Sequence, residues 1–294
     1  MNFGIMDKHT CDDIDQRVRS LIKEMGLREP PISMADVVAH LEIDHSFYDI
    51  NDPTFYDGLL HKMKLGAFKV KGVLQKVGMQ GLWFPQEDKI MLDAALPKPK
   101  HKWVTAHEIG HRLIPTHRYF LFGDTAETLD PEYQEMLEQE ANYCASALTF
   151  MGKKFTAEAL DTNPCWENIH NLHARYQTSA TSTLRRYVEY SHNRPMLGIV
   201  STPPWENSTE HKSRCRYFVP SRQFKLRFSN ISSDKILPLI EEGVHRARGG
   251  PVGTSEFIIG DIWGKTHEFT SESFYNRHDL LTFIVAKKSD WSAV

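Results

Sequence analysis

The spacing of apolar residues near the start of the chain predicts two helices that each bury one face. Between residues 12 and 25, apolar side chains recur every three or four positions, and Gly26 follows as a helix-ending residue. Ser33 can cap a second, shorter helix over 34–41. We expect both helices to pack against a core.

A strand-forming pattern follows these helices. Apolar and polar residues alternate or form short apolar runs through 58–60, 67–70 and 82–84. A last short strand is expected at Ile90–Asp93, before a loop that contains prolines at 97 and 99. These segments predict a small β-rich region after the first two helices.

The helical period returns in the middle of the chain. One helix is predicted over His101–Leu113, and Pro115 ends or kinks it. The composition of 116–130 indicates a loop, after which Asp130 and Pro131 suit the start of a second helix. That helix is expected from about Glu132 to Phe150, and its small, apolar second half should be buried.

Residues 166–191 form a further helical stretch with a break near Thr178–Ser179. With Arg185 and Arg186 after the break, the pattern is typical of a helix-turn-helix that contacts DNA. It equally suits two helices that only extend a core. We favour that second interpretation, because helix pairs commonly serve packing alone and the flanking segment is not strongly basic.

Residues 192–195 indicate a linker, after which strands and turns prevail. The predicted elements are strands at 197–200, 216–219, 224–228, 256–263, 266–270 and 280–287, with one helix at 234–246. Together they predict an α+β domain of about 100 residues. The whole chain is expected to be α+β.

Composition narrows the class of protein. The 294 residues carry a formal net charge of −3, which argues against a uniformly basic nucleic-acid binder. The start has no basic segment followed by a long apolar run, and no stretch of about 18 apolar residues occurs, so neither a secretory signal nor a membrane span is expected. The four scattered cysteines form no C-x-x-C pair, which favours free thiols in the cytoplasm.

The strongest chemical motif is His-Glu-x-x-His, at His107, Glu108 and His111. Two histidines four residues apart lie on one helix face and can bind one Zn²⁺ through their ring nitrogens. Glu108 lies off the direct line to the metal, where it can take a proton from a water. Ile90–Asp93, just ahead of this helix, is our candidate for a sheet edge that pairs with an extended substrate, and an ordinary strand explains it equally well.

A catalytic zinc needs a third protein ligand, and the later helix offers four acids, Glu132, Glu135, Glu138 and Glu140. Glu138 shares a helix face with Asn142, which can hydrogen-bond to a ligand histidine. Glu140 lies about 200° around the helix from Glu138, so both cannot face one metal. Glu140 is the second choice, and we expect it in solvent or in a salt bridge.

These two motifs resemble the ImmA/IrrE family of metallopeptidases. That family joins His-Glu-x-x-His to a later helix of the form E-x-x-A-N-x-x-A-x-x-L, present here over Glu138–Leu148. The resemblance covers about residues 15–155 and implies that His107, His111 and Glu138 bind zinc, with Glu108 as the general base. Thr149–Gly152 departs from the Leu-Met-Pro that usually ends this helix, which does not change the ligand set.

The resemblance also implies a role. Family members cleave repressors of phage or stress-response type, and some carry a helix-turn-helix and a GAF-like domain after the peptidase core. We therefore expect a zincin-like peptidase domain at 1–155, a helix-turn-helix-like segment at 156–193 and a sensory domain of GAF or PAS type at 194–294. The expected partner is a helix-turn-helix repressor, with DNA contact through 166–191 as a weaker prediction and no membrane.

The leading hypothesis is a cytoplasmic zinc endopeptidase that cuts a transcriptional repressor in a stress or mobile-element response. Mn²⁺ or Fe²⁺ also suits a site with two histidines and one glutamate. The alternative is a metal-containing regulator or sensor that acts by binding DNA or a protein, without proteolysis. The residue that stabilises the oxyanion is left open among His117, Arg118 and Tyr119, which follow the metal helix.

Overall fold

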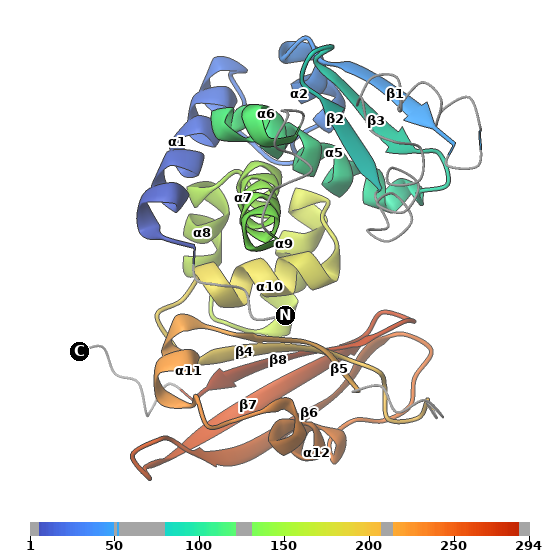
Figure 1. The fold of residues 1–294 in the computed structure, drawn as a ribbon. Coiled ribbons are helices and arrows are strands. Elements are labelled where there is room, and N and C mark those ends of the chain that lie inside the picture. The colour runs from blue at the N-terminus through green and yellow to red at the C-terminus, as the bar shows by residue number, and fades with distance from the viewer. Residues whose placement is uncertain (1–5, 50–51, 53–79, 122–130, 207–213, 288–294) are drawn as a thin grey trace. The chain divides into compact units, whose positions relative to one another are not determined.

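The computed structural model describes residues 6–49, 52, 80–121, 131–206 and 214–287. The chain divides into two compact units, residues 1–152 and 153–294 (Figure 1). Both units contain helices and strands, so the expected mixed α+β class is confirmed. The strands expected at 58–60 and 67–70 lie outside the described residues, and the three-domain division stays a prediction.

The first unit joins helices to a small sheet. Its elements in chain order are α1 (Lys8–Glu24), α2 (Met34–His40), β1 (Asp44–Tyr48), β2 (Gly81–Phe84), β3 (Lys89–Asp93), α5 (Lys98–Leu113), α6 (Pro115–Leu121) and α7 (Pro131–Thr149). Ser33 caps α2 by accepting a hydrogen bond from the backbone N–H of Asp36, as its position before the helix predicts.

The sheet of the first unit has the strand order β1-β3-β2. β3 pairs in parallel with β1 and antiparallel with β2, so it is the central strand. The prediction that Ile90–Asp93 forms a free edge is therefore wrong: both sides of its backbone are already hydrogen-bonded to neighbours. Its burial fits a central strand, since Ile90 and Leu92 are fully buried.

Helices α5 and α7 approach each other closely in the first unit (Figure 1). The contact is made at Gly110, where an added Cβ would lie 2.8 Å from the carbonyl oxygen of Ala141. Ala141 and Cys144, which face that glycine, are fully buried. Small residues on both helices therefore set the distance between them, which explains the small, apolar second half of α7.

In the described part of the second unit, three helices are followed by a five-stranded sheet with two more helices. Its elements are α8 (Lys153–Leu160), α9 (Trp166–Tyr176), α10 (Ala180–Tyr190), β4 (Met196–Ser201), β5 (Cys215–Pro220), α11 (Arg222–Arg227), α12 (Ser233–Glu241), β6 (Gly250–Gly260), β7 (Thr266–Tyr275) and β8 (Leu280–Ala286). The sheet has the order β5-β4-β8-β7-β6, and every neighbouring pair is antiparallel.

Both faces of this sheet are covered near its centre. Leu197 and Ile199 of β4 belong to a core shared with Phe224 of α11 and Ile236 of α12. Gly198, which points to the opposite face, meets the side chains of α10 instead. Coverage on both faces explains why β4 and β8 are buried throughout and mostly apolar rather than alternating.

Three expectations about elements are wrong. Residues 224–228 are mainly helix α11, because Ser221 accepts a hydrogen bond from the backbone N–H of Phe224 and starts a helix where the alternating pattern indicated a strand. The loop expected from residue 116 begins instead with α6. The helix expected over 234–246 ends at Glu241, five residues early.

The helical pair α9 and α10 packs onto the sheet of its own unit. The Trp166 ring stacks on Phe274 of β7, and Leu184 of α10 packs toward Gly198. Arg186 is only 5% exposed, and its guanidinium lies over the Tyr190 ring. Because it is buried, Arg186 cannot reach a phosphate as a DNA-reading helix would require. DNA contact through this segment stays a prediction, while the packing interpretation fits these contacts.

The contact at Gly110 generates a stability prediction. We expect Gly110→Ala to lower the free energy of unfolding by about 1–3 kcal/mol, since the added methyl overlaps the Ala141 carbonyl and the helices must move apart. Urea denaturation followed by circular dichroism measures this change. Gly260→Ala is the matched control, because an added Cβ there meets nothing within 4 Å. Equal effects of the two substitutions would contradict the prediction.

Candidate metal centre

Three side chains from α5 and α7 meet at one point. The Nε2 atoms of His107 and His111 lie 3.2 Å apart, and the carboxylate oxygens of Glu138 lie 3.2 Å from the first and 3.4 Å from the second. Among the described residues, these three form a group of potential ligand atoms that all lie within 4.8 Å of one another. The helical spacing of the two histidines and the contact at Gly110 together produce this cluster.

Asn142 contacts the far side of the first histidine. The distance from His107 Nδ1 to Asn142 Oδ1 is 3.1 Å, and an amide oxygen only accepts hydrogen bonds. His107 therefore donates from Nδ1, which leaves a lone pair on Nε2, the atom that faces Glu138. Glu138 and Asn142 are one helical turn apart on α7, so the two contacts come from one helix face.

The second histidine is held by a buried chain of hydrogen bonds through His117 to Glu140, which we call the relay. Sequence reasoning did not predict it. His111 Nδ1 lies 2.9 Å from Nδ1 of His117, and Nε2 of His117 lies 2.9 Å from Glu140 Oε2. His117 is fully buried, and Glu140 is 9% exposed rather than in solvent. Since the carboxylate accepts, His117 donates from Nε2, and its Nδ1 can then accept a hydrogen bond from Nδ1 of His111 in the tautomer that suits a metal ligand.

Pro115 creates this relay. It lacks a backbone N–H, so it cannot continue α5, but it suits the first position of α6. Ile114 is extended between the two helices, and the chain then folds His117 back onto His111. The spacing of residues along the chain could not predict the contact of His117 with His111, because this contact depends on the angle between α5 and α6.

The proton positions leave three electron-rich atoms facing one another. In the neutral tautomers with the proton on Nδ1, which Asn142 and His117 can accept, both Nε2 atoms present lone pairs to a cation, and the third group is a carboxylate. Such an arrangement favours a cation at its centre. Zn²⁺ held tetrahedrally at about 2.0–2.1 Å separates neighbouring ligand atoms by about 3.3 Å. The 3.2 Å between the two Nε2 atoms matches that value, and each Nε2 lies at a similar distance from one of the two Glu138 oxygens, so the residues fit a divalent cation.

Glu108 lies beside the cluster in a closed environment. It is 6% exposed, and burial raises the pKa of its carboxyl to about 7, although the charge of His107 and the backbone N–H of Trp83 oppose this shift. Gly81 of β2 leaves room for the carboxylate, since an added Cβ would lie 2.7 Å from Glu108 Oε1. A carboxyl poised near neutral pH can accept and return a proton.

The other members of the cluster have shifted pKa values too. Burial lowers the pKa of His111 to about 4, so its ring is neutral at pH 7, as a metal ligand must be. Burial also acts on Glu138, but in metal-free protein a proton on Nε2 of an imidazole is donated to the carboxylate, and these contacts with His107 and His111 hold the pKa of Glu138 well below its usual range. Glu138 is therefore ionised at neutral pH.

The three residues considered for the oxyanion lie in different surroundings. Both ring nitrogens of His117 are engaged, so it has no free donor for a substrate. Arg118 donates to the backbone carbonyl of Pro85. The side chain of Tyr119 lies outside the described part of the structure.

The fold and the cluster define an α+β protein with a His-His-carboxylate group suited to a divalent cation. Residues 60–187 match the family model of the M78 peptidases, described as the IrrE N-terminal-like domain. This part of the chain is therefore similar to the IrrE N-terminal-like domain, and the resemblance drawn from the two motifs is confirmed.

A solved structure from Mycobacterium tuberculosis, a transcriptional regulator, has a similar fold, with a TM-score of 0.52. The alignment covers 94% of this chain and 89% of that one at 11% sequence identity, so the likeness concerns the fold alone. The search of curated proteins found no match. In the described part of the chain, no helix has both the length and the apolar character needed to cross a membrane.

The buried position of Glu108 predicts a pH-dependent stability. A carboxyl whose folded pKa is raised contributes full stability below its ordinary pKa and loses it as pH rises through about 7. In metal-free protein, Glu108→Gln cannot ionise, so its stability relative to the wild type should grow between pH 5 and pH 8, by up to about 3 kcal/mol. Urea denaturation across that range with a chelator measures the difference.

Glu135→Gln is the control for this experiment, since Glu135 is an exposed acid on α7. Its stability relative to the wild type should stay constant between pH 5 and pH 8. A constant difference for Glu108→Gln as well would show that the Glu108 carboxyl does not titrate in an environment that disfavours its charge.

The relay predicts that Glu140, which does not belong to the candidate ligand set, affects the affinity for the metal. Replacing Glu140 by leucine leaves His117 without its acceptor, so the Nδ1 proton of His111 is no longer held, and we expect the Kd for Zn²⁺ to rise about 10–100-fold. Glu140→Gln should lose less, because its amide oxygen still accepts from His117. Competition with a chromophoric chelator measures both values.

Glu135→Leu removes an exposed acid from the same helix and should leave the Kd for Zn²⁺ unchanged. Circular dichroism of the metal-free variants shows whether each is folded. A folded Glu140→Leu variant that binds Zn²⁺ as tightly as the wild type would disprove the role of the relay.

Proposed function

We propose that this protein is a zinc-dependent endopeptidase of the ImmA/IrrE type. One observation supports it above all. The ring nitrogens of His107 and His111 and the carboxylate of Glu138 form one group of potential metal ligands, beside the buried Glu108, whose pKa is about 7. The cluster among the described residues offers three protein ligands, which leaves a position for water, as catalytic zinc sites require. A structural zinc site would instead be closed by four protein ligands.

In this proposal, His107, His111 and Glu138 would hold the cation, with Asn142 orienting His107. When bound, the cation lowers the pKa of a water and polarises the scissile carbonyl. Glu108 takes a proton from the attacking water and then donates it to the amine that leaves. Gly81 and the backbone N–H of Trp83 position the Glu108 carboxyl for both transfers.

The proposed substrate is a transcriptional repressor with a helix-turn-helix, cleaved in the cytoplasm during a stress or mobile-element response. The family of the domain at 60–187 supports peptidase activity, and the name of the structural neighbour supports a role in regulation. Zn²⁺ is the proposed ion, with Mn²⁺ or Fe²⁺ as alternatives for the same ligands. The competing proposal is a regulator that keeps the metal but acts by binding.

Glu108→Gln separates the two proposals. Incubation of the zinc-loaded protein with each helix-turn-helix repressor encoded beside its gene should produce one discrete cut, detected by mass spectrometry. Glu108→Gln should keep its zinc and lose at least about 10²–10⁴-fold in cleavage rate, because the base is gone. Glu135→Gln is the control and should cleave normally.

A binding regulator would behave differently. In that case the wild type would leave every such repressor intact, and Glu108→Gln would keep full regulatory function in cells. That result would reject the peptidase proposal while leaving the metal cluster in place.

A further inference from the structure

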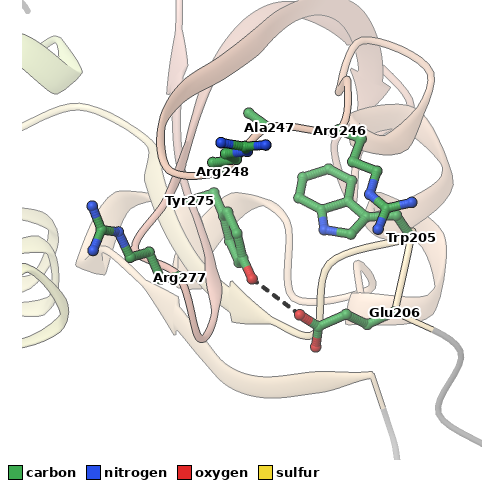
Figure 2. A pocket seen from close by; sticks show the side chains of 7 residues that line it. All are labelled: Trp205, Glu206, Arg246, Ala247, Arg248, Tyr275 and Arg277. Atoms are coloured by element: carbon green, nitrogen blue, oxygen red, sulfur yellow. Dashed lines mark hydrogen bonds between the residues drawn. The ribbon is translucent and has the colours of Figure 1, made fainter.

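The second unit contains a hollow of about 480 Å³ that the proposed function does not use (Figure 2). We call it the arginine pocket. It is lined by Trp205, Glu206, Arg246, Ala247, Arg248, Tyr275 and Arg277. These residues come from three segments of the unit. Trp205 and Glu206 follow β4, residues 246–248 connect α12 to β6, and Tyr275 and Arg277 lie at the end of β7 and in the turn that follows. Its volume lies within the range of small-molecule sites.

The floor of the pocket is aromatic and fixed in place. Tyr275 is 9% exposed and belongs to a small core with Val252 and Leu280, against which Trp205 packs. The Trp205 and Tyr275 rings meet edge to face, with centroids 5.3 Å apart. Figure 2 shows the hydroxyl of Tyr275 pointing to Glu206, to which it donates a hydrogen bond of 3.0 Å. The pocket therefore has rigid ring surfaces, and its one lining carboxylate already has a partner.

The arginines of the pocket lack acidic partners. No carboxylate of the described residues pairs with Arg246, Arg248 or Arg277, although other arginines of the unit are paired. Arg214 bridges to Glu241 at 2.7 Å, and Arg216 bridges to Asp279 at 3.0 Å. Carboxylates of the unit therefore pair with neighbouring arginines. In Figure 2, Arg246 lies beside Trp205 and Arg248 beside Tyr275, where both are available to an anion, while the Arg277 guanidinium points away on the far side of Tyr275.

The backbone also fits the placement of Arg277. This residue has φ 76°, which a non-glycine residue adopts only at a cost of order 1 kcal/mol or more. Its Cγ and Nε lie 3.4 and 3.5 Å from the point where a Cβ on Gly249 would be, and Gly249 itself has φ 144°. These are ordinary van der Waals distances, so Gly249 packs against the stem of Arg277, and it is its positive φ that favours glycine at this position.

We propose that the arginine pocket binds a small phosphate monoester that carries a planar ring, as a nucleoside monophosphate does. Arg246 and Arg248 flank the rings of Trp205 and Tyr275, and a phosphate monoester of charge about −1.5 to −2 offers these two guanidinium groups more negative charge than a single carboxylate does. Guanidinium groups also bind phosphate in a bidentate manner. Trp205 and Tyr275 supply ring surfaces on which the base can pack.

Isothermal titration of the full chain with the four common nucleoside 5′-monophosphates, in about 0.15 M salt, tests this proposal. At least one should bind, and the matching nucleoside and inorganic phosphate should each bind at least about 10-fold more weakly, because each lacks one half of the recognised structure. The double substitution Arg246→Gln with Arg248→Gln should raise the Kd at least about 10-fold. Trp205→Leu should weaken the monophosphate but not inorganic phosphate.

Arg222→Gln is the matched control, since Arg222 is an exposed arginine of the same unit outside the pocket. It should leave the Kd unchanged, and circular dichroism should show that all variants are folded. The proposal is overturned if no monophosphate binds, if Arg222→Gln weakens binding as much as the double substitution, or if only a single-stranded oligonucleotide binds. None of these readouts depends on peptidase activity.

Discussion

The close contact of α5 with α7 at Gly110 is the constraint on which the metal cluster depends. His107 and His111 lie on one helix and Glu138 on the other, so the distance between the helices decides whether the three groups meet. Gly110 lies between the two histidines, and with no side chain it lets α7 approach until Ala141 touches it. Glu138, three residues before Ala141, then lies beside both imidazoles.

Hydrogen bonds to the Nδ1 atoms of His107 and His111 determine which ring nitrogen is available to a metal. An imidazole can bind a metal through Nε2 only if its proton is held on Nδ1. Asn142 holds it for His107, and the buried pair of His117 and Glu140 holds it for His111. Helix α7 thus carries the candidate ligand Glu138 and the two residues Asn142 and Glu140, whose hydrogen bonds orient the histidines. Glu138 and Glu140 lie on different faces of α7, about 200° apart.

Sequence reasoning could predict what depends on local spacing. The period of apolar residues predicted most of the helices, and the four-residue spacing predicted that His107 and His111 lie on one face of α5. Helix spacing favoured Glu138 among four acids, because it shares a face with Asn142, and the family motif implied the same residue. Glu140 and His117 could not be foreseen as partners, since the turn at Pro115 and the packing of α6 bring them together.

The errors have similar physical causes. Residues 224–228 alternate apolar and basic side chains, which suits a strand, but the serine cap at 221 and a fully buried Phe224 favour a helix on the sheet. Ile90–Asp93 looked like an edge because its partner β1 follows α2 far earlier in the chain, and parallel pairing over such a distance leaves no local pattern.

The cluster also implies that cation binding and folding are coupled in the first unit. Without a cation, the two Nε2 atoms and the Glu138 carboxylate still lie 3.2–3.4 Å apart, and hydrogen bonding to Glu138 raises the pKa of His107 against the effect of burial. A divalent cation that binds there must displace the proton that these groups share, so its affinity depends on pH. A cation that binds the folded chain alone adds RT ln(1 + [L]/Kd) to the stability of the fold. The helix contact at Gly110 must consequently be strong enough to hold the ligands together beforehand, which is why its atoms lie among the most buried of the unit.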